Sequence, residues 1–122
     1  MDAQERQDLE HYGSWERMTG GEWFLPSMPE AKEEHQRTFR LVKQLNELQN
    51  TDQERAEGIL REILPEESAV PGLHVPLNLE YGCNLVCGER VFINFGATIL
   101  AQAKVTLGDG VMVGPNCSLI TV

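Results

Sequence analysis

This sequence most clearly lacks long apolar runs and any paired-cysteine motif. No stretch approaches the roughly 18 apolar residues of a membrane-spanning helix, and the first residues, MDAQERQDLE, are polar and acidic rather than signal-like. The three cysteines, Cys83, Cys87 and Cys117, are odd in number and have no CxxC spacing, which argues against a disulfide framework and against a metal site. We therefore expect a cytoplasmic protein with no membrane partner and no metal.

Positive charge is also scarce, because the chain has 10 Lys and Arg against 19 Asp and Glu and a formal net charge of −9. The imbalance lies in the first part of the chain: residues 1–68 hold 16 acids and 8 bases, whereas residues 69–122 hold 3 acids and 2 bases. A basic surface for nucleic acid is therefore not expected. The acidic excess is typical of solvated helix faces, and an acidic binding surface is the alternative.

A six-residue rhythm runs through the carboxy-terminal part of the chain. A period of six fits neither an α-helix nor a long strand, so it predicts a coil of short flat sides with one inward residue per side. The inward positions, with a two-residue step after the third, are Cys87, Ile93, Ile99, Leu107, Val113 and Leu119. Small or compact residues lie four places after the first five of these positions: Val91, Ala97, Ala103, Val111 and Cys117.

Residues suited to tight corners fall between these predicted sides. Glycine and asparagine tolerate the positive φ and the crowded backbone of a corner. Five such residues lie near the predicted corners: Gly88, Gly108, Gly110, Gly114 and Asn116. An antiparallel sandwich of short strands is the alternative, although its strands would alternate and its turn clusters would lie about 8–12 residues apart.

The first half of the chain is organised as helices. Residues 1–15 are a polar tail or a short helix. The charged segment that follows contains Trp23 and Phe24, which we expect to pack in a core or to line a substrate cleft. Ser27 and Thr51 each precede a Glu three residues later, as in a capping box, and predict two helix starts. Pro65 is predicted to end the second helix.

The two helices are expected to form a hairpin with one apolar face, because their apolar residues recur at three- and four-residue steps. The first helix should end near Asn50. The residues predicted to face inward are Ala31, His35, Phe39, Val42, Leu45 and Leu48 or Gln49 in the first helix, and Ala56, Ile59, Leu60, Ile63 and Leu64 in the second. Three parts are thus expected: the tail 1–15, a helical module 16–68 and the coil 69–122. An extended segment from Val75 to Tyr81 is expected to lead into the coil.

The motifs ERMTGGEW, LEYGCNLVCGERVFINFGATIL and VTLGDGVMVGPNCSLIT follow one another over residues 16–122, with the two helices between the first and the second. This ordered set resembles the maltose and galactoside O-acetyltransferases of the hexapeptide-repeat acyltransferase superfamily. The resemblance implies a mainly β fold, a left-handed parallel β-helix with an amino-terminal helical hairpin module. It also implies a homotrimer that transfers acetyl from acetyl-CoA to a sugar hydroxyl.

The resemblance also assigns roles to single residues. Asn94, within Phe92-Ile93-Asn94-Phe95, matches the family asparagine that stabilises the reacting centre, and a corner asparagine is the structural alternative. Glu80 and Tyr81 match positions near the sugar, where a plain solvated carboxylate is the alternative for Glu80. Gln102 lies where the family usually has an aspartate for the sugar, so the resemblance does not assign a particular acceptor.

One family element has no counterpart among residues 1–122. The family's general base is a histidine in a histidine-proline loop just after the GPN segment, and none of His11, His35 and His74 matches it. The acidic residue usual after the aromatic pair at Phe24 is missing as well. We therefore expect the coil to be truncated and this chain to be inactive alone. The alternatives are a non-catalytic structural or oligomerisation remnant and a dimerising helical hairpin.

Overall fold

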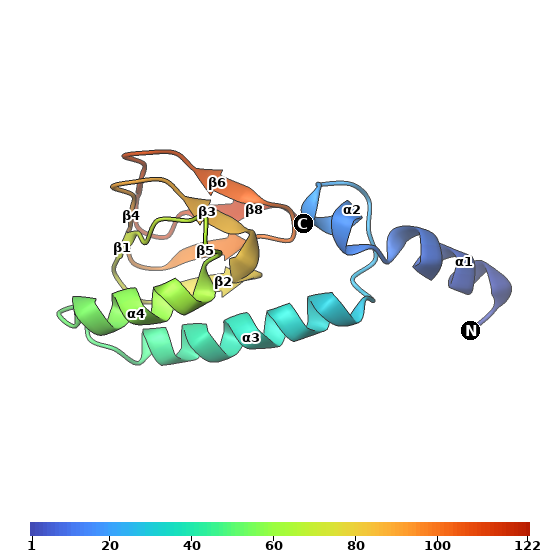
Figure 1. Ribbon diagram of the computed structural model, residues 1–122, viewed down its shortest axis with the longest axis horizontal. Coiled ribbons are helices and arrows are strands. Elements are labelled where there is room, and N and C mark those ends of the chain that lie inside the picture. Colours follow the sequence, from blue (N-terminus) through green and yellow to red (C-terminus); the bar gives the residue numbers. More distant parts are fainter.

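The computed structural model describes residues 1–122 and shows a coil of short strands with helices at one end (Figure 1). The helices are α1 (Ala3–Tyr12), α2 (Trp15–Thr19), α3 (Pro29–Asn46) and α4 (Gln53–Ile63), and one 3-10 turn, η1, spans Gly82–Asn84. The strands are β1 (Gly72–Leu73), β2 (Leu77–Glu80), β3 (Leu85–Cys87), β4 (Phe92–Ile93), β5 (Ala97–Leu100), β6 (Val105–Leu107), β7 (Met112–Val113) and β8 (Ser118–Ile120). No helix is long and apolar enough to cross a membrane.

The strands form three parallel sheets, in the orders β1-β4-β7, β2-β5-β8 and β3-β6. Every pairing joins residues 20 apart, as in Gly72 with Phe92 and Leu77 with Ala97. One turn of the coil therefore takes 20 residues and contributes one strand to each sheet. The parallel pairings exclude the antiparallel sandwich, whose neighbouring strands would run in opposite directions.

The predicted inward positions stack in pairs along this coil. Cys87 pairs with Leu107, Ile93 with Val113 and Ile99 with Leu119. Five of the six side chains are buried and Leu119 is partly buried against the same core, so this prediction is confirmed. Of the compact residues four places further on, Ala103 is only half-buried in the corner 101–104, where Ala101 is fully buried.

The two-residue step in the sequence is a wide corner of the coil. In the first turn this corner contains η1, and in the second it spans residues 101–104. Asn84 links the two turns, because its Nδ2 donates to the carbonyl oxygens of Ala101 and Gln102 at 3.0 and 3.1 Å. At the tighter corners, Gly110 and Asn116 have positive φ values of +73° and +57°, as predicted from the presence of glycine and asparagine there.

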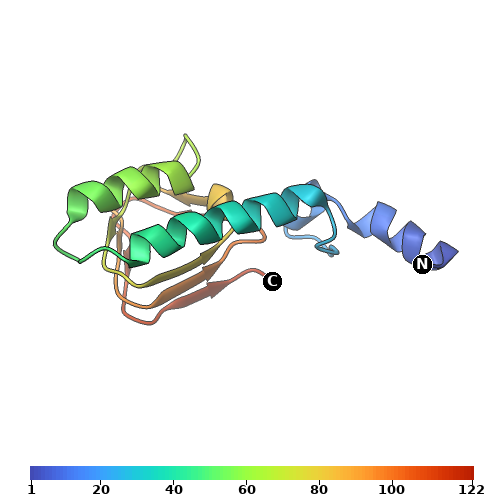
Figure 2. The ribbon, with the colours of Figure 1, turned by 90° about the horizontal axis from the view of Figure 1, so that it is seen from below.

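The helical hairpin α3–α4 covers the first turn of the coil, while the last strands lie at the far end (Figures 1 and 2). A single apolar cluster joins both parts, with Leu45 and Ile63 from the helices beside Leu77 and Ile99 from the coil. The first helix differs from its prediction: Phe39 is 52% exposed and His35 is half-buried, whereas Thr38 and Leu41 are buried. Ala31, Val42 and Leu45 are buried as predicted, so the buried stripe keeps these positions and takes in Thr38 and Leu41 in place of His35 and Phe39.

Both predicted helix caps are wrong. The N-cap residues are Met28 and Asp52, neither with a side-chain cap, rather than Ser27 and Thr51. The first helix also ends at Asn46 instead of near Asn50. Tertiary contacts explain this early end, because Asn46 binds the backbone of β2: its Oδ1 accepts from Leu77 N and its Nδ2 donates to Leu77 O, both at 2.8 Å. The second helix ends at Ile63, before Pro65, as predicted.

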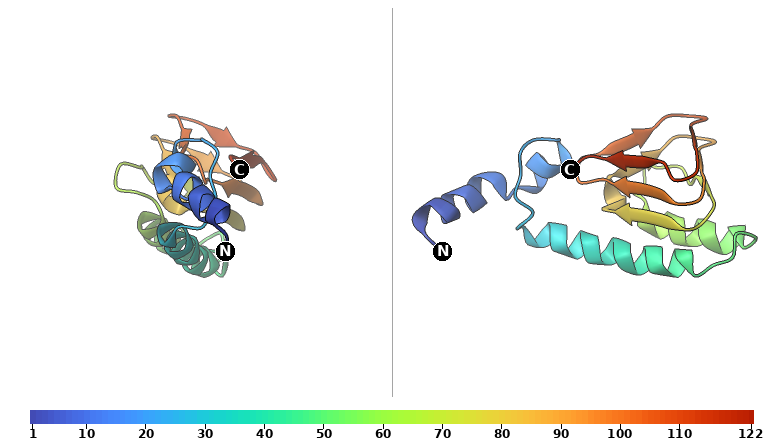
Figure 3. Two further views of the ribbon diagram at one scale, coloured as in Figure 1. Left: turned by 90° about the vertical axis from the view of Figure 1, so that its right-hand side faces the viewer. Right: turned by 180° about the vertical axis from the view of Figure 1, so that it is seen from behind.

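The amino-terminal segment extends away from the coil (Figure 3). The predicted polar tail contains α1, which has no buried residue, so the short-helix alternative is correct. A small second core joins α2 to the coil through Met18, Met28, Ala31 and Tyr81, with Trp15 and Phe24 packed against it. Phe24 thus has the predicted packing role. Trp23 does not, because it is 86% exposed.

Candidate functional site

The wide corner of the coil brings together three of the four predicted site residues. Glu80 is the last residue of β2, Tyr81 follows it with a left-handed backbone (φ 58°), and Gln102 lies in the same corner one turn later. The Nε2 of Gln102 donates to Glu80 Oε2 at 3.1 Å, and Nε2 of His35 on α3 lies 3.5 Å from Glu80 Oε1. Glu80 and Gln102 are both half-buried, so this carboxylate–amide pair is partly shielded from water.

Tyr81 differs from the other two because its side chain is buried. It packs edge-on against Trp15, with 6.3 Å between ring centroids, and at a tilt of 50° against His35, with 5.5 Å between centroids. Burial, with smaller effects of Glu80 and Glu34, raises the pKa of the Tyr81 phenol. The phenol therefore stays neutral at physiological pH, and its body holds α2 and α3 against the corner. The predicted contact between Tyr81 and a substrate stays a prediction.

Gln102 carries an unsatisfied acceptor: its Oε1 is buried and has no hydrogen-bond partner. Such an atom costs free energy unless a ligand or water supplies a donor. Gln102 also lines a groove of about 650 Å³ between the α2 segment and the coil, together with Arg17, Gly21, Glu22, Trp23, Phe24, Pro26, Thr121 and Val122. Two aromatic side chains, Trp23 and Phe24, thus lie in one groove with several polar groups, a combination that can orient a small polar molecule.

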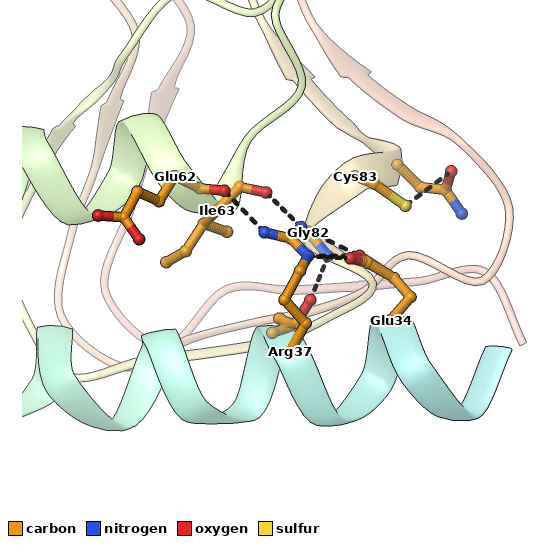
Figure 4. Close-up of polar contacts among 8 residues, drawn as sticks. Glu34, Arg37, Glu62, Ile63, Gly82 and Cys83 are labelled. Atoms are coloured by element: carbon orange, nitrogen blue, oxygen red, sulfur yellow. Dashed lines mark hydrogen bonds and ion pairs between the residues drawn. The ribbon is translucent and has the colours of Figure 1, made fainter. Parts of the chain in front are cut away.

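A polar cluster beneath this corner fixes its position (Figure 4). Arg37 on α3 donates to the carbonyl oxygens of Glu62 and Ile63 at 2.7 and 2.9 Å, and it pairs with Glu34. The hydrogen bond from Arg37 to Glu34 raises the pKa of the guanidinium. The fully buried Thr38, next to Arg37, accepts a hydrogen bond from the Gly82 backbone N–H at 2.9 Å. The hairpin is therefore tied directly to the residues that follow Tyr81.

Cys83 lies in the same cluster and is not a reactive thiol. Burial, followed by the charge of Glu34, raises the pKa of Cys83 to about 12. A thiol with this pKa remains protonated at physiological pH, and only the thiolate is an effective nucleophile. No group of three or more His, Cys, Asp or Glu side chains is arranged to hold a metal ion.

Asn94 lies at a different corner, directly after β4. The sheet β2-β5-β8 separates it from Glu80, because Leu77 and Glu80 pair with Ala97 and Leu100 respectively. Three residues of strand span about 10 Å at roughly 3.3 Å per residue. Within one chain, Asn94 is therefore not brought together with Glu80 and Gln102. Its Oδ1 accepts from Phe95 N–H at 2.9 Å.

The three histidines have distinct surroundings. His11 lies on the projecting α1 and contacts only Tyr12 among the rings, and His35 lies beside Glu80. His74 is half-buried next to Asn94, with its Nδ1 3.4 Å from Asn94 Oδ1. From the sequence, His74 has no predicted role. The missed signal is its spacing of 20 residues from Asn94, the length of one turn.

Comparison with known proteins agrees with this fold. The family described as "Maltose acetyltransferase hexapeptide capping motif" matches residues 17–67, which include α3 and α4. Nodulation protein L of Rhizobium leguminosarum bv. viciae is 33% identical over 106 residues, which are 87% of this chain and 56% of that protein.

Two solved structures have the same architecture. A maltose O-acetyltransferase from Clostridium difficile 630 superposes with a TM-score of 0.78 at 25% identity, over 85% of this chain and 56% of that one. A hexapeptide-repeat acetyltransferase from Vibrio cholerae O1 biovar eltor, solved with acetyl coenzyme A, gives a TM-score of 0.70 at 27% identity, over 86% of this chain and 57% of that one.

A three-sided parallel coil with a helical hairpin over its first turn is the architecture of these hexapeptide-repeat acetyltransferases. Within this class, the chain belongs to the maltose and galactoside O-acetyltransferase family. It spans about half the length of the curated relatives it matches.

Proposed function

We propose that this chain serves an O-acetyltransferase that moves acetyl from acetyl-CoA to a sugar hydroxyl. The observation that carries the proposal is the Glu80–Gln102 pair. The side-chain oxygen Oε1 of Gln102 has no hydrogen-bond partner, and Gln102 lines the same groove as Trp23. A sugar hydroxyl supplies the donor that this oxygen lacks and can also donate to the Glu80 carboxylate. The acetyl coenzyme A bound by the Vibrio cholerae neighbour supports the choice of donor.

The proposed reaction is a single displacement at the thioester carbon. The sugar oxygen forms a bond to the acetyl carbon, a base accepts the hydroxyl proton, and the carbon–sulfur bond breaks to release the thiol of coenzyme A. The carbonyl oxygen gains negative charge as the new bond forms, and the Asn94 amide is the donor we assign to it. In the family the base is the histidine of the histidine-proline loop, so we assign that role to none of the three histidines here.

The proposed assembly is a homotrimer of left-handed coils. Asn94 and the Glu80–Gln102 pair lie at opposite ends of one sheet, and a copy placed alongside would bring the Asn94 corner of one chain to the acceptor corner of another. Apolar side chains on the outside of the coil support such packing, because Phe95, Met112 and Ile120 are exposed there. We further propose the division into residues 1–15, 16–68 and 69–122, and a cytoplasmic location.

The test measures release of the coenzyme A thiol by the protein purified as its gene encodes it. The acceptors are galactosides, maltose and glucose. We expect turnover with at least one sugar. The variant Asn94→Ala should lower kcat by roughly 10²–10³-fold, as loss of one oxyanion donor does, and Glu80→Gln should mainly raise KM.

The matched control is Asn78→Ala, since Asn78 lies on β2 and only shares an exposed hydrogen bond with Thr98. This variant should leave both constants unchanged. Absence of turnover with every sugar would refute the proposal and favour a non-catalytic structural module, for which a trimer without activity is the expected finding.

A further inference from the structure

The corner that contains Asn94 holds an ordered set of side chains from two turns of the coil. His74 directly follows β1 and Asn94 directly follows β4, and these two strands pair in parallel. The backbone continues this register, because His74 N donates to Ile93 O at 3.0 Å and Asn94 N donates to Val113 O at 2.9 Å. His74 therefore lies directly beside Asn94 along the coil.

Two aromatic rings fix the orientation of the His74 imidazole. The ring stacks on Phe95 with 4.7 Å between centroids and an interplanar angle of 28°. It meets Phe92 edge-on at 4.9 Å and 90°. Held between them, the imidazole places Nδ1 at 3.4 Å from Asn94 Oδ1, slightly longer than a usual N–H···O hydrogen bond.

The oxygen of the Asn94 side chain accepts from the Phe95 backbone N–H at 2.9 Å, and His74 Nδ1 faces it as a second donor when that nitrogen carries hydrogen. A carbonyl oxygen has two lone pairs, so both donors can be accepted at once. The Nδ2 group has no hydrogen-bond partner within the chain. An amide held at its oxygen from two sides presents its N–H groups in a fixed direction, which is what stabilisation of a developing oxyanion requires.

We propose that His74 is a positioning residue for Asn94. By donating from Nδ1, the imidazole locks the side-chain amide so that Nδ2 points away from the coil, ready to donate to an anionic or carbonyl oxygen. This requires the tautomer with hydrogen on Nδ1, or the imidazolium. The catalytic part of this inference rests on the function proposed above, whereas the locking of the amide does not.

Two variants of His74 separate the donor from the ring. His74→Phe keeps an aromatic ring between Phe92 and Phe95 but removes the donor. His74→Asn removes the ring but keeps an amide N–H near the place of Nδ1. His11→Phe, at an exposed histidine on α1, is the matched control for loss of an imidazole.

The first readout is the mobility of the Asn94 side-chain amide, measured by ¹⁵N relaxation of its NH₂ group in the 122-residue chain. We expect the amide to be rigid in the parent and in His74→Asn, and mobile in His74→Phe. An equally rigid amide in His74→Phe would overturn the proposal, because the donor would then be irrelevant.

The second readout is acetyl transfer by the protein as its gene encodes it. The loss of one orienting hydrogen bond should lower kcat about threefold to tenfold in His74→Phe, with KM for the sugar unchanged and with His74→Asn close to the parent. A parent without turnover would refute the proposed function alone, since the relaxation result stands by itself. Normal kcat in His74→Phe beside an active parent would overturn the positioning role.

Discussion

The hydrogen bond between Thr38 and Gly82 provides the sharpest test of how the helical hairpin is joined to the coil. Thr38 is fully buried in α3, and its Oγ1 accepts from the Gly82 backbone N–H at 2.9 Å. Thr38→Val has nearly the same shape but has no acceptor. The Gly82 N–H would then be buried without a partner, at a cost of about 1–3 kcal/mol in the free energy of unfolding.

The measurement is urea unfolding followed by circular dichroism, with the denaturation midpoint and slope compared between variants. The control is Thr98→Val, since the Thr98 hydroxyl only accepts an exposed hydrogen bond from Asn78 at 3.3 Å. Its effect should remain within about 0.5 kcal/mol. Equal midpoints for Thr38→Val and the parent would refute the reasoning, because the Gly82 N–H would then have another partner or access to water.

Three further predictions concern the same part of the molecule. Arg37→Ala removes donors to the Glu62 and Ile63 carbonyl oxygens and should lower the free energy of unfolding by about 1–3 kcal/mol in urea titrations. Arg40→Ala, on the exposed side of α3, should change it little. Leu45→Ala, at a fully buried position, should lose about 2–5 kcal/mol in the same titration, and a smaller loss would mean that the core collapses into the cavity.

The third prediction is a pH dependence. Because the pKa of Cys83 is raised to about 12 in the folded chain from an ordinary value of 9.0, its contribution to stability is full below pH 9 and is lost as pH rises toward 12. The urea midpoint should therefore fall over this window, and less so in Cys83→Ala; parallel curves would contradict it.

The coil could be predicted from the sequence because its signal is local and repeated. Cys87, Ile93 and Ile99 follow a fixed spacing, and a side chain that faces inward in one turn has its equivalent 20 residues later. The spacing does not identify the inward residue of the wide corner, because the extra residues there place Ala103 partly outside the core and Ala101 inside it. A two-residue step in the sequence does not say which of the added residues remains inside.

Features that depend on contacts between distant segments were not predictable. The end of α3 is set by Asn46, which binds β2 from 31 positions away in the sequence. For Trp23 the sequence left a core role and a cleft role open, and the side chain is exposed on the groove rather than packed in a core. The role of His74 was not predicted because it depends on Asn94, which lies 20 residues away in the sequence.

The constant 20-residue turn makes the length of the coil adjustable in whole units. Removing residues 88–107 would join Cys87 to Gly108. Cys87 and Leu107 occupy equivalent positions in successive turns, so each later side chain would keep its inside or outside position. Removing a single residue within a strand would instead turn every following side chain to the wrong face. Natural variants of this architecture should therefore differ by complete turns, or by loops at the corners, and rarely by one residue within a side.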